Sequence, residues 1–331
     1  MANLRAGLIG LGMMGRNHAR VLRSLPGVDL VAVADPAGDP HGAVGAQDVL
    51  GSVEELIAAG LDYATVALPT ALHHEVGLAL AAAGVHALIE KPLAHDSAAA
   101  ADLVRAFEKA GLIGAVGHIE RCNAALRSAR ERLAAGELGE IYQVATRRQG
   151  PFPARIADVG VVKDLATHDV DLTAWLVGQD YTSVTAHTVH RSGREHEDLV
   201  AVLGLLRAGT ITNHLVNWLS PLKERTVTVT GDRGAFVADT LTADLTFYGN
   251  GSAPTAWSSI SAFRGVSEGD VIRYAIAKPE PLRVEHENFR DAVLGLGADI
   301  VTLAEGLATV RVAEAVLTSA RTGRTELLVA Q

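Results

Sequence analysis

Short apolar runs alternate with segments of helical spacing over the first third of the chain. Apolar strands separated by Ala-rich or charged helices predict a parallel sheet with helices on both faces, the doubly wound α/β arrangement. The predicted strands cover residues 4–10, 28–35, 63–69, 86–92 and 113–118.

The hydrophobic pattern changes after residue 120. Val, Thr and Leu then alternate with polar residues, and this period of two predicts a large, mainly antiparallel open sheet. Helices on one face of that sheet would make a second domain of the α+β class. At 331 residues we expect two domains, 1–120 and 121–331. Strands are predicted within 141–148, 183–190, 199–217, 225–239 and 244–249, helices within 163–176, 283–297 and 303–320, and a loop over 249–281.

Composition and charge narrow the class of protein. The chain is 48% hydrophobic with a net charge of −9, so it lacks the basic surface that would favour nucleic acid or an anionic membrane as a partner. Its one cysteine, Cys122, excludes an internal disulfide. No leader pattern and no apolar run of roughly 18 residues is present, so we expect a cytoplasmic protein without a membrane partner.

A glycine-rich loop follows the first predicted strand. Gly10, Gly12 and Gly15 have GxGxxG spacing and open a helix whose N-terminus can receive a pyrophosphate. The second predicted strand ends at Asp35, which can accept hydrogen bonds from a ribose 2′-hydroxyl and would repel a 2′-phosphate. The pattern predicts a Rossmann domain that binds NAD rather than NADP; the alternative is an ordinary α/β turn with an incidental Asp.

Polar residues also follow the other predicted strands of the first domain. Ligands of open α/β sheets bind outside the carboxyl ends of strands, so these positions are candidate contacts. Lys91 is the most notable, because Pro92 after it excludes helical geometry and a lysine there could orient a hydroxyl and share its proton. An isolated lysine would otherwise be read as solvated. The positions are Pro69 and Thr70, Glu90 and Lys91, and His118.

The predicted helix 163–176 begins with ionisable residues. Its apolar stripe, followed backwards at helical spacing, reaches His168 and then Asp164. Histidine can act as a general base near neutral pH, and Asp164 one turn earlier could orient it. Alternatives are a core histidine with a helix cap, or a metal pair; the pair lacks the further clustered ligands of a metal site. We expect Asp169 and Asp171 to face solvent or cap the helix.

Three motifs in this order, GLIGLGMMGRNH, LPTALHHEVGLALAAAGVHALIEKPLA and KDLATHDVD, resemble the Gfo/Idh/MocA family of oxidoreductases. The resemblance implies a Rossmann domain, an α+β domain whose open sheet often mediates homodimers or homotetramers, and NAD(P)-linked oxidation or reduction of a sugar or cyclitol hydroxyl. It places Lys91 at the catalytic centre, with Asp164 and His168 as the family's D-x-x-x-H pair. The implied dinucleotide contacts are Gly10, Gly12, Met13, Met14, Gly15, Asp35, Pro69, Thr70, His73, Glu90, Lys91 and His118.

Within the family, GHIERCNAAL and the stretch from GELGEIYQ to KDLATHDVDL resemble the branch of UDP-N-acetylglucosamine 3-dehydrogenases. Cys122 and Ala124 depart from that branch. The leading hypothesis is NAD-dependent oxidation at carbon 3 of a UDP-N-acetyl-hexosamine, with His168 as general acid/base, Lys91 as electrostatic partner and proton relay, and Asp164 as orienter. The alternatives are an inositol or free-sugar dehydrogenase and a non-catalytic NAD-binding regulator.

An arginine cluster precedes the Asp164 helix. Arg147, Arg148 and Arg155 surround a loop containing Pro and Gly, and guanidinium groups suit a diphosphate. In an acidic protein such a cluster predicts an anion clamp for a nucleotide sugar; the alternative is a solvated strand edge. Arg121 and Asn123 are further predicted substrate contacts.

Overall fold

The computed structural model describes residues 3–152, 159–251 and 267–328. The chain divides into two compact units: the first comprises Met1–Ile119 and Pro279–Arg311, and the second Glu120–Lys278 and Val312–Gln331. The segment 279–311 was expected in the second domain, and this expectation is wrong. It returns to the first unit because Phe289, Leu303 and Leu307 pack into the cores around the parallel strands.

The first unit contains a parallel sheet with the strand order β3-β2-β1-β4-β5-β6 over its described residues. The doubly wound fold and the five predicted strands are confirmed. The sequence pattern missed β3, which has only two residues and hence no detectable period. The strands are β1 Leu4–Ile9, β2 Val28–Ala34, β3 Val49–Leu50, β4 Tyr63–Val66, β5 His86–Glu90 and β6 Gly114–Gly117.

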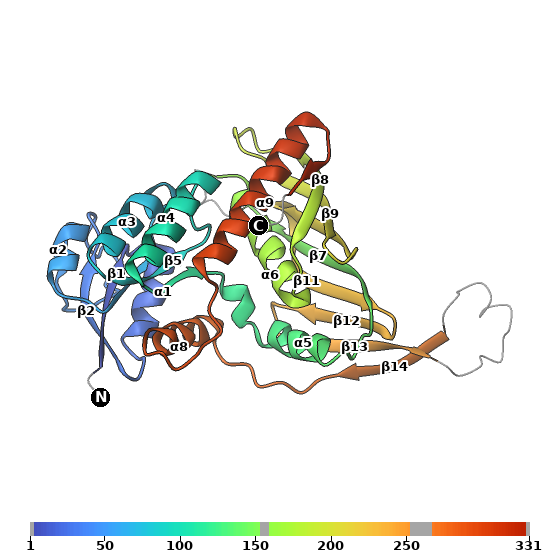
Figure 1. The fold of residues 1–331 in the computed structure, drawn as a ribbon, viewed down its shortest axis with the longest axis horizontal. Helices are drawn as coiled ribbons and strands as arrows, with labels where there is room; N and C mark the ends of the chain where they lie inside the picture. Colours follow the sequence, from blue (N-terminus) through green and yellow to red (C-terminus); the bar gives the residue numbers. More distant parts are fainter. Residues whose placement is uncertain (1–2, 153–158, 252–266, 329–331) are drawn as a thin grey trace. The chain divides into compact units, whose positions relative to one another are not determined.

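Helices cover the sheet of the first unit (Figure 1). They form where apolar positions recur at helical spacing, and local signals end them. In α4 the Asp96 side chain accepts a hydrogen bond from the Ala99 amide at 2.8 Å, and Gly111 closes the helix at φ 65°. The helices are α1 Met13–Leu22, α2 Val53–Ala58, α3 His73–Ala82, α4 Ser97–Ala110 and α8 Pro281–Val293, with the 3-10 turn η1 Thr70–Leu72.

The second unit contains a mixed sheet with the strand order β14-β13-β12-β11-β7-β10-β9-β8-β15 within the described ranges. The mainly antiparallel sheet is confirmed; β7 and β10 pair in parallel. A strand, β14, lies in the predicted loop 249–281 and pairs with β13, so that part of the loop prediction is wrong. The strands are β7 Ile141–Pro151, β8 Tyr181–Val189, β9 Leu199–Leu206, β10 Ile211–Asn217, β11 Leu219–Gly231, β12 Gly234–Asp239, β13 Asp244–Gly251, β14 Ser267–Arg273 and β15 Glu326–Leu327.

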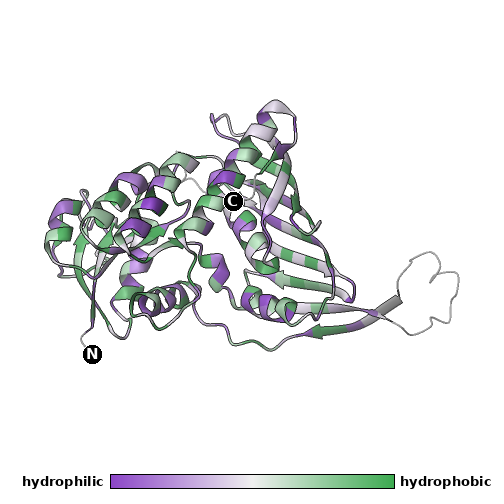
Figure 2. Ribbon diagram, in the orientation of Figure 1, coloured by the Kyte–Doolittle hydropathy of each residue, from purple (hydrophilic) through white to green (hydrophobic). Residues whose placement is uncertain are grey.

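Helices pack on one face of this second sheet (Figure 1). Strand residues alternate between that face and the outward face, and Figure 2 shows this as alternating colours along β11 and β12. Two apolar cores lie beneath the helices, one around Val162, Val200 and Val316 and one around Leu172 and Phe236. The helical elements are the 3-10 turn η2 Ile119–Cys122, α5 Ala124–Ala134, the π-helical turn η3 Val162–Ala166, α6 Thr167–Val177 and α9 Leu303–Thr322, which continues from the first unit.

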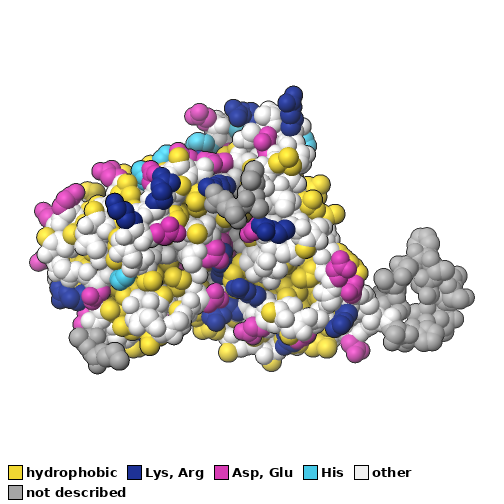
Figure 3. Space-filling model, in the orientation of Figure 1, with side chains coloured by type: hydrophobic (Ala, Val, Ile, Leu, Met, Phe, Trp, Pro, Cys, Tyr) yellow, Lys and Arg dark blue, Asp and Glu magenta, His cyan; other side chains and the backbone are white. Residues whose placement is uncertain are grey.

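Lys and Arg side chains are interspersed with Asp and Glu on the face drawn in Figure 3. Within the described ranges, the helices are too short or too polar for any of them to cross a bilayer.

Candidate active site

The carboxyl edge of the parallel sheet brings together residues far apart in sequence. Asp35 follows β2, Gly10 follows β1, Pro69 comes after β4, Lys91 follows β5 and His118 follows β6. Because the strand order is β2-β1-β4-β5-β6, these residues lie in that order along one edge. The order reverses between β1 and β4, the switch point where open α/β sheets bind ligands.

The glycine loop has the geometry that a pyrophosphate requires. Gly10 has φ 94°, and a Cβ on Gly15 would come within 2.7 Å of the Gly10 carbonyl carbon, so helix and loop are in direct contact. A Cβ on Gly12 would meet nothing within 4 Å, so its backbone is open to a ligand. Helix α1 starts there without a side-chain cap or an acid in its first turn, beside exposed Met13 and half-buried Met14. This free N-terminus fits the phosphates of NAD.

Asp35 couples the glycine loop to the end of β2. Its carboxylate accepts hydrogen bonds from the Leu11 amide at 2.7 Å and the Ala37 amide at 2.8 Å. A carboxylate has about four lone-pair sites, so acceptor capacity remains for a ribose hydroxyl. The loop that follows, PAGDP, contains no arginine to balance a 2′-phosphate. The site therefore fits NAD, with Asp35 holding the loop as well as facing the ligand edge.

His73 joins the loops that follow β4 and β5. Its ring is fully buried at the start of α3, with Nδ1 2.9 Å from the Pro92 carbonyl oxygen and Nε2 2.9 Å from the Leu68 carbonyl oxygen. Burial lowers the pKa of His73, although these carbonyl contacts oppose the shift. Its predicted cofactor contact stays a prediction, since both ring nitrogens already contact backbone. Pro69 is exposed and Thr70 half-buried at this edge.

Glu90 and Lys91 end strand β5. Glu90 is buried, and its Oε2 accepts a hydrogen bond from the Lys91 amide at 3.1 Å. Its Oε1 lies 2.9 Å from Nε2 of His18, a buried residue of α1 that the sequence patterns did not indicate. Lys91 is half-buried at the carboxyl edge of the sheet. These bonds support a role in which Glu90 acts by holding Lys91, rather than by contacting the cofactor directly.

In the second unit, Asp164 and His168 lie on consecutive helical turns of different type. Asp164 belongs to the π-helical turn η3, and His168 to the first turn of α6. The wider π-turn changes the α-helical spacing expected between these two residues, and such turns are frequent at functional sites. Both residues are buried. The carboxylate of Glu197 accepts a hydrogen bond from the Val162 amide at 2.9 Å and so caps this segment from another part of the chain.

Asp169 and Asp171 do not face solvent, so the prediction for them is wrong. Arg121 donates from Nε and a terminal nitrogen to the two carboxylate oxygens of Asp171, at 2.8 and 2.6 Å. Arg148 donates to Asp169 at 3.0 Å and to Glu120 at 2.9 Å. The side chains of both arginines and both aspartates are almost fully buried, and that of Glu120 is 19% exposed. The two pairs anchor α6, the helix of His168, to η2 and β7.

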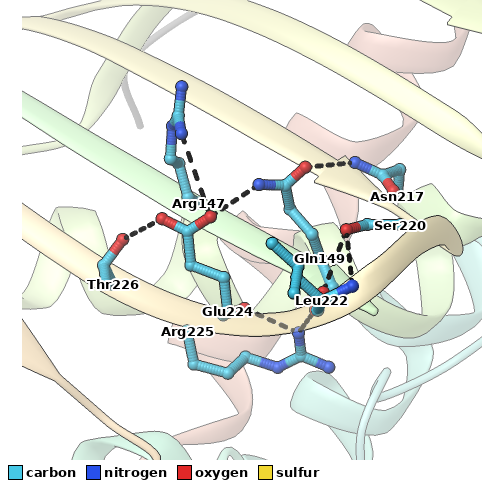
Figure 4. Close-up of polar contacts among 8 residues, drawn as sticks. All are labelled: Arg147, Gln149, Asn217, Ser220, Leu222, Glu224, Arg225 and Thr226. Carbon is cyan, nitrogen blue, oxygen red and sulfur yellow. Dashed lines mark hydrogen bonds and ion pairs between the residues drawn. The ribbon is translucent and has the colours of Figure 1, made fainter. Parts of the chain in front are cut away.

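The predicted cluster of arginines is divided by the sheet, which corrects the clamp hypothesis. Arg148 points to the helix face and is held by two carboxylates, whereas Arg147 is exposed on the other face. Figure 4 shows Arg147 and Gln149 converging on Glu224, 3.8 and 2.7 Å from its carboxylate. Arg155 lies outside the described residues.

Other predicted substrate contacts have structural partners. Asn123 begins α5: its side chain accepts from the Ala125 amide at 3.0 Å and donates to the Thr240 carbonyl at 3.0 Å. The binding roles of Arg121, Asn123 and Arg148 stay predictions, and their contacts give each a role in holding the second unit together. Among the described residues, no group of three or more His, Cys, Asp and Glu side chains could hold a metal ion.

Sequence comparisons agree with this geometry. Residues 4–118 match the oxidoreductase family with an NAD-binding Rossmann fold, and residues 126–237 match the GFO/IDH/MocA C-terminal domain. The chain is 30% identical over 297 residues to UDP-N-acetylglucosamine 3-dehydrogenase of Acidithiobacillus ferrooxidans, covering 88% of this chain and 90% of that protein. It is 33% identical over 199 residues to scyllo-inositol 2-dehydrogenase (NAD(+)) of Bacillus subtilis, covering 56% of this chain and 57% of that protein.

Solved structures show the same fold over nearly the whole chain. UDP-N-acetylglucosamine 3-dehydrogenase GnnA from A. ferrooxidans superposes with a TM-score of 0.83 at 26% identity, covering 97% of this chain and 99% of that one. GenD2 from gentamicin A biosynthesis, solved in complex with NAD, gives a TM-score of 0.82 at 26% identity, covering 100% and 97%. The prediction of an NAD-dependent enzyme is confirmed, which excludes the alternative of a non-catalytic NAD-binding regulator. The chain therefore belongs to the Gfo/Idh/MocA family of NAD-dependent oxidoreductases.

Proposed function

We propose that this oxidoreductase oxidises the carbon 3 hydroxyl of a UDP-N-acetyl-hexosamine. One observation supports this substrate more than any other: the similarity to UDP-N-acetylglucosamine 3-dehydrogenase extends over 88% of the chain and includes the second unit. The similarity to the B. subtilis inositol dehydrogenase covers 56% of the chain. Oxidation of an inositol is the second candidate, since several relatives are named for it.

The proposed chemistry assigns a separate role to the cofactor, His168, Asp164 and Lys91. NAD, which the glycine loop and Asp35 would hold, would supply the acceptor for the hydride of carbon 3. His168 takes the hydroxyl proton, because an imidazole can accept a proton near neutral pH without a large perturbation. Asp164 orients the imidazole or the neighbouring hydroxyl, and the ammonium of Lys91 stabilises negative charge that develops on the oxygen. The anchoring of α6 by Arg121 and Arg148 supports a fixed position for His168 within the second unit.

An isotope experiment tests both the substrate and the reacting carbon. Purified protein and NAD are mixed with UDP-N-acetylglucosamine deuterated at carbon 3, and reduced cofactor is followed by absorbance and mass spectrometry. The proposal expects one deuterium in the reduced cofactor and a slower rate than with the unlabelled sugar. Reduced cofactor without deuterium would place the oxidation at another carbon. Turnover of inositols alone, in a parallel panel, would favour the second candidate.

A pair of histidine variants tests the assignment of the base. His168→Ala should lose most of kcat, roughly a hundredfold or more, while the Kd for NAD stays within a few-fold of the unmodified protein. His187→Ala is the matched control, because His187 is an exposed histidine of β8 in the same unit. Full activity of His168→Ala would refute the assignment.

Self-association stays a prediction that the outward face of the second sheet supports. Leu203, Leu205 and Ile211 are 56%, 41% and 47% exposed on adjacent strands β9 and β10, an apolar area that a second subunit could cover. Light scattering of Leu203→Asp should then show a smaller species than the unmodified protein. Equal masses would remove this face from consideration. A cytoplasmic location likewise stays a prediction.

A further inference from the structure

A chain of buried polar side chains runs behind the end of strand β5 in the first unit. His18 of α1 lies between two partners: its Nε2 is 2.9 Å from Oε1 of Glu90, and its Nδ1 is 2.8 Å from Nε2 of His286 in α8. His18 and His286 are fully buried and Glu90 nearly so. The other oxygen of Glu90 accepts the Lys91 amide. The chain His286–His18–Glu90 therefore ends at the lysine to which the proposed function gives a catalytic role.

The position of each proton in this chain follows from its neighbours. Burial raises the pKa of Glu90, but the hydrogen bond and charge of His18, with the charge of Lys91, outweigh burial, so the pKa lies below its usual value. An ionised carboxylate only accepts hydrogen bonds, so His18 carries a proton on Nε2. Burial and then the charge of His18 lower the pKa of His286 well below its usual value, so His286 is neutral.

Two arrangements satisfy the contact between His18 and His286. In the first, Nε2 of His286 donates to Nδ1 of His18, and Nδ1 of His286 is an unprotonated acceptor. In the second, His18 donates and His286 carries its proton on Nδ1. That atom has no hydrogen-bond partner among the described residues, so the second arrangement would bury an unpaired donor. With Nδ1 of His18 unprotonated the first arrangement is favoured, and with Nδ1 protonated, as in a charged imidazolium, the second is required. In both arrangements the Nε2–H of His18 is directed at Glu90.

The surroundings keep the negative charge on Glu90. Burial, and then the charge of Glu90, raise the pKa of Glu285 in α8 well above its usual value, which favours the neutral form of this neighbour. The other titratable groups that act on Glu90 are His18, Lys91 and, from α3, His73. The Glu90 carboxylate packs against Gly117 of β6, where the absence of a side chain gives it room. A Cβ on Gly117 would lie 3.3 Å from the carboxylate carbon and from Oε2 of Glu90.

We propose that His18 and His286 are positioning residues, which hold the Glu90 carboxylate against the Lys91 backbone and keep its negative charge beside the Lys91 ammonium. This inference rests on the proposed function for the role of Lys91. Neither histidine touches the reacting atoms in this scheme. They act through Glu90, so their loss should change the ionisation of Glu90 and the pH dependence of turnover. If the histidines contributed only packing, their loss would change stability alone.

The test compares four variants of the full chain. His18→Leu removes both contacts, and His286→Leu removes the partner of His18 Nδ1. His18→Gln is the conservative variant, because its amide offers an N–H to Glu90 and an oxygen to His286. His214→Leu is the matched control, since His214 is an equally buried histidine of the second unit, 2.7 Å from Thr146 Oγ1 and 2.8 Å from the Tyr181 hydroxyl.

Two readouts are measured with NAD bound. The first is the titration of Glu90, followed by carboxyl 13C NMR and identified by the resonance that Glu90→Gln removes. The second is the acid limb of kcat/KM against pH. In His18→Leu we expect the pKa of Glu90 to rise by about one unit or more, because burial remains while its hydrogen bond is lost. Because His168 sets the acid limb in the proposed function, the raised pKa of Glu90 should change that limb by adding a second protonation step, with a further loss of about tenfold in kcat/KM for each pH unit below that pKa.

The other variants complete the expectation. His286→Leu should shift both readouts in the same direction by less, and His18→Gln should stay near the unmodified protein. His214→Leu should lower Tm without moving either readout. The proposal is overturned if His18→Leu lowers Tm as His214→Leu does and leaves both readouts unchanged, or if Glu90 shifts and the acid limb does not. If His18→Leu does not fold, unchanged readouts in His286→Leu overturn it.

Failure of the proposed function is a separate outcome. It would be seen as absence of turnover in the unmodified protein with every sugar tested. The titration of Glu90 needs no substrate, so an unshifted Glu90 in His18→Leu would still overturn the role of the two histidines.

Discussion

Two glycines of the loop after β1 should respond in opposite ways to the same substitution. A Cβ on Gly12 would meet nothing within 4 Å, and the residue has φ −60°, which alanine adopts without strain. A Cβ on Gly15 would lie 2.7 Å from the Gly10 carbonyl carbon and closer to its oxygen. Gly10 cannot retreat, because it is itself packed against the backbone of Ala67. Gly12→Ala should therefore affect ligand binding, and Gly15→Ala the fold.

The magnitudes follow from these contacts. Gly15→Ala forces a methyl group against backbone, at a cost of about 3 kcal/mol, offset by about 1 kcal/mol of helix propensity. A net loss of about 2 kcal/mol should lower Tm by roughly 4–8 °C in a unit of this size. Gly12→Ala should leave the apo protein unchanged or about 0.5 kcal/mol more stable. Its methyl group would block phosphate contacts worth about 2–3 kcal/mol, which raises the Kd for NAD roughly 30- to 150-fold.

The assay measures each variant twice. Thermal unfolding without cofactor reports the fold, and isothermal titration with NAD reports binding. Gly12→Ala should change only the second measurement, and Gly15→Ala should change the first. If Gly12→Ala bound NAD as tightly as the unmodified protein, the open backbone at Gly12 would not be the phosphate site. An unchanged Tm in Gly15→Ala would show that helix α1 can move away from the loop.

Two further predictions concern buried charges. Arg148→Met leaves the carboxylates of Asp169 and Glu120 buried without their partner, so the free energy of unfolding measured in urea should fall by about 3–5 kcal/mol. Adding Asp169→Asn should recover part of this loss. An unchanged free energy of unfolding would contradict the anchoring role. Glu285 has a raised pKa in the fold and the ordinary value when unfolded, so its contribution to stability is complete below about pH 4.5 and declines as pH rises toward the folded pKa. Glu285→Gln should therefore match the unmodified protein at pH 4 and exceed its stability increasingly as the pH rises toward the folded pKa, by about 1.4 kcal/mol for each unit between the two pKa values. A gap that does not grow with pH in thermal melts would refute this.

Features that depend on residues close together in the sequence could be predicted from the sequence. The glycine loop is read from a spacing of a few residues, and burial on both faces makes parallel strands continuous apolar runs. The carboxyl ends of such strands meet at one edge, so the row from Asp35 to Lys91 and His118 could be expected before any coordinates. The family resemblance then indicated Asp164 and His168, whose roles stay predictions.

Contacts between distant segments had no such local signal. The pair His18–His286 spans 268 residues, Arg121–Asp171 spans 50 and Arg148–Asp169 spans 21. Asp169 and Asp171 appeared solvent-facing because an acidic residue in a helix is usually exposed unless it is paired, and their partners lie on other elements.

The sequence by itself therefore determined the two folds and the NAD loop, because hydrophobic period and short motifs are local properties. The class of reaction followed from the resemblance of its motifs to a known family. Only the tertiary structure decided which charges are buried in pairs, that 279–311 packs with the first unit, and that Glu90 contacts His18, which in turn contacts His286. A buried charge must find its partner wherever the fold brings one, and that partner can lie anywhere along the chain.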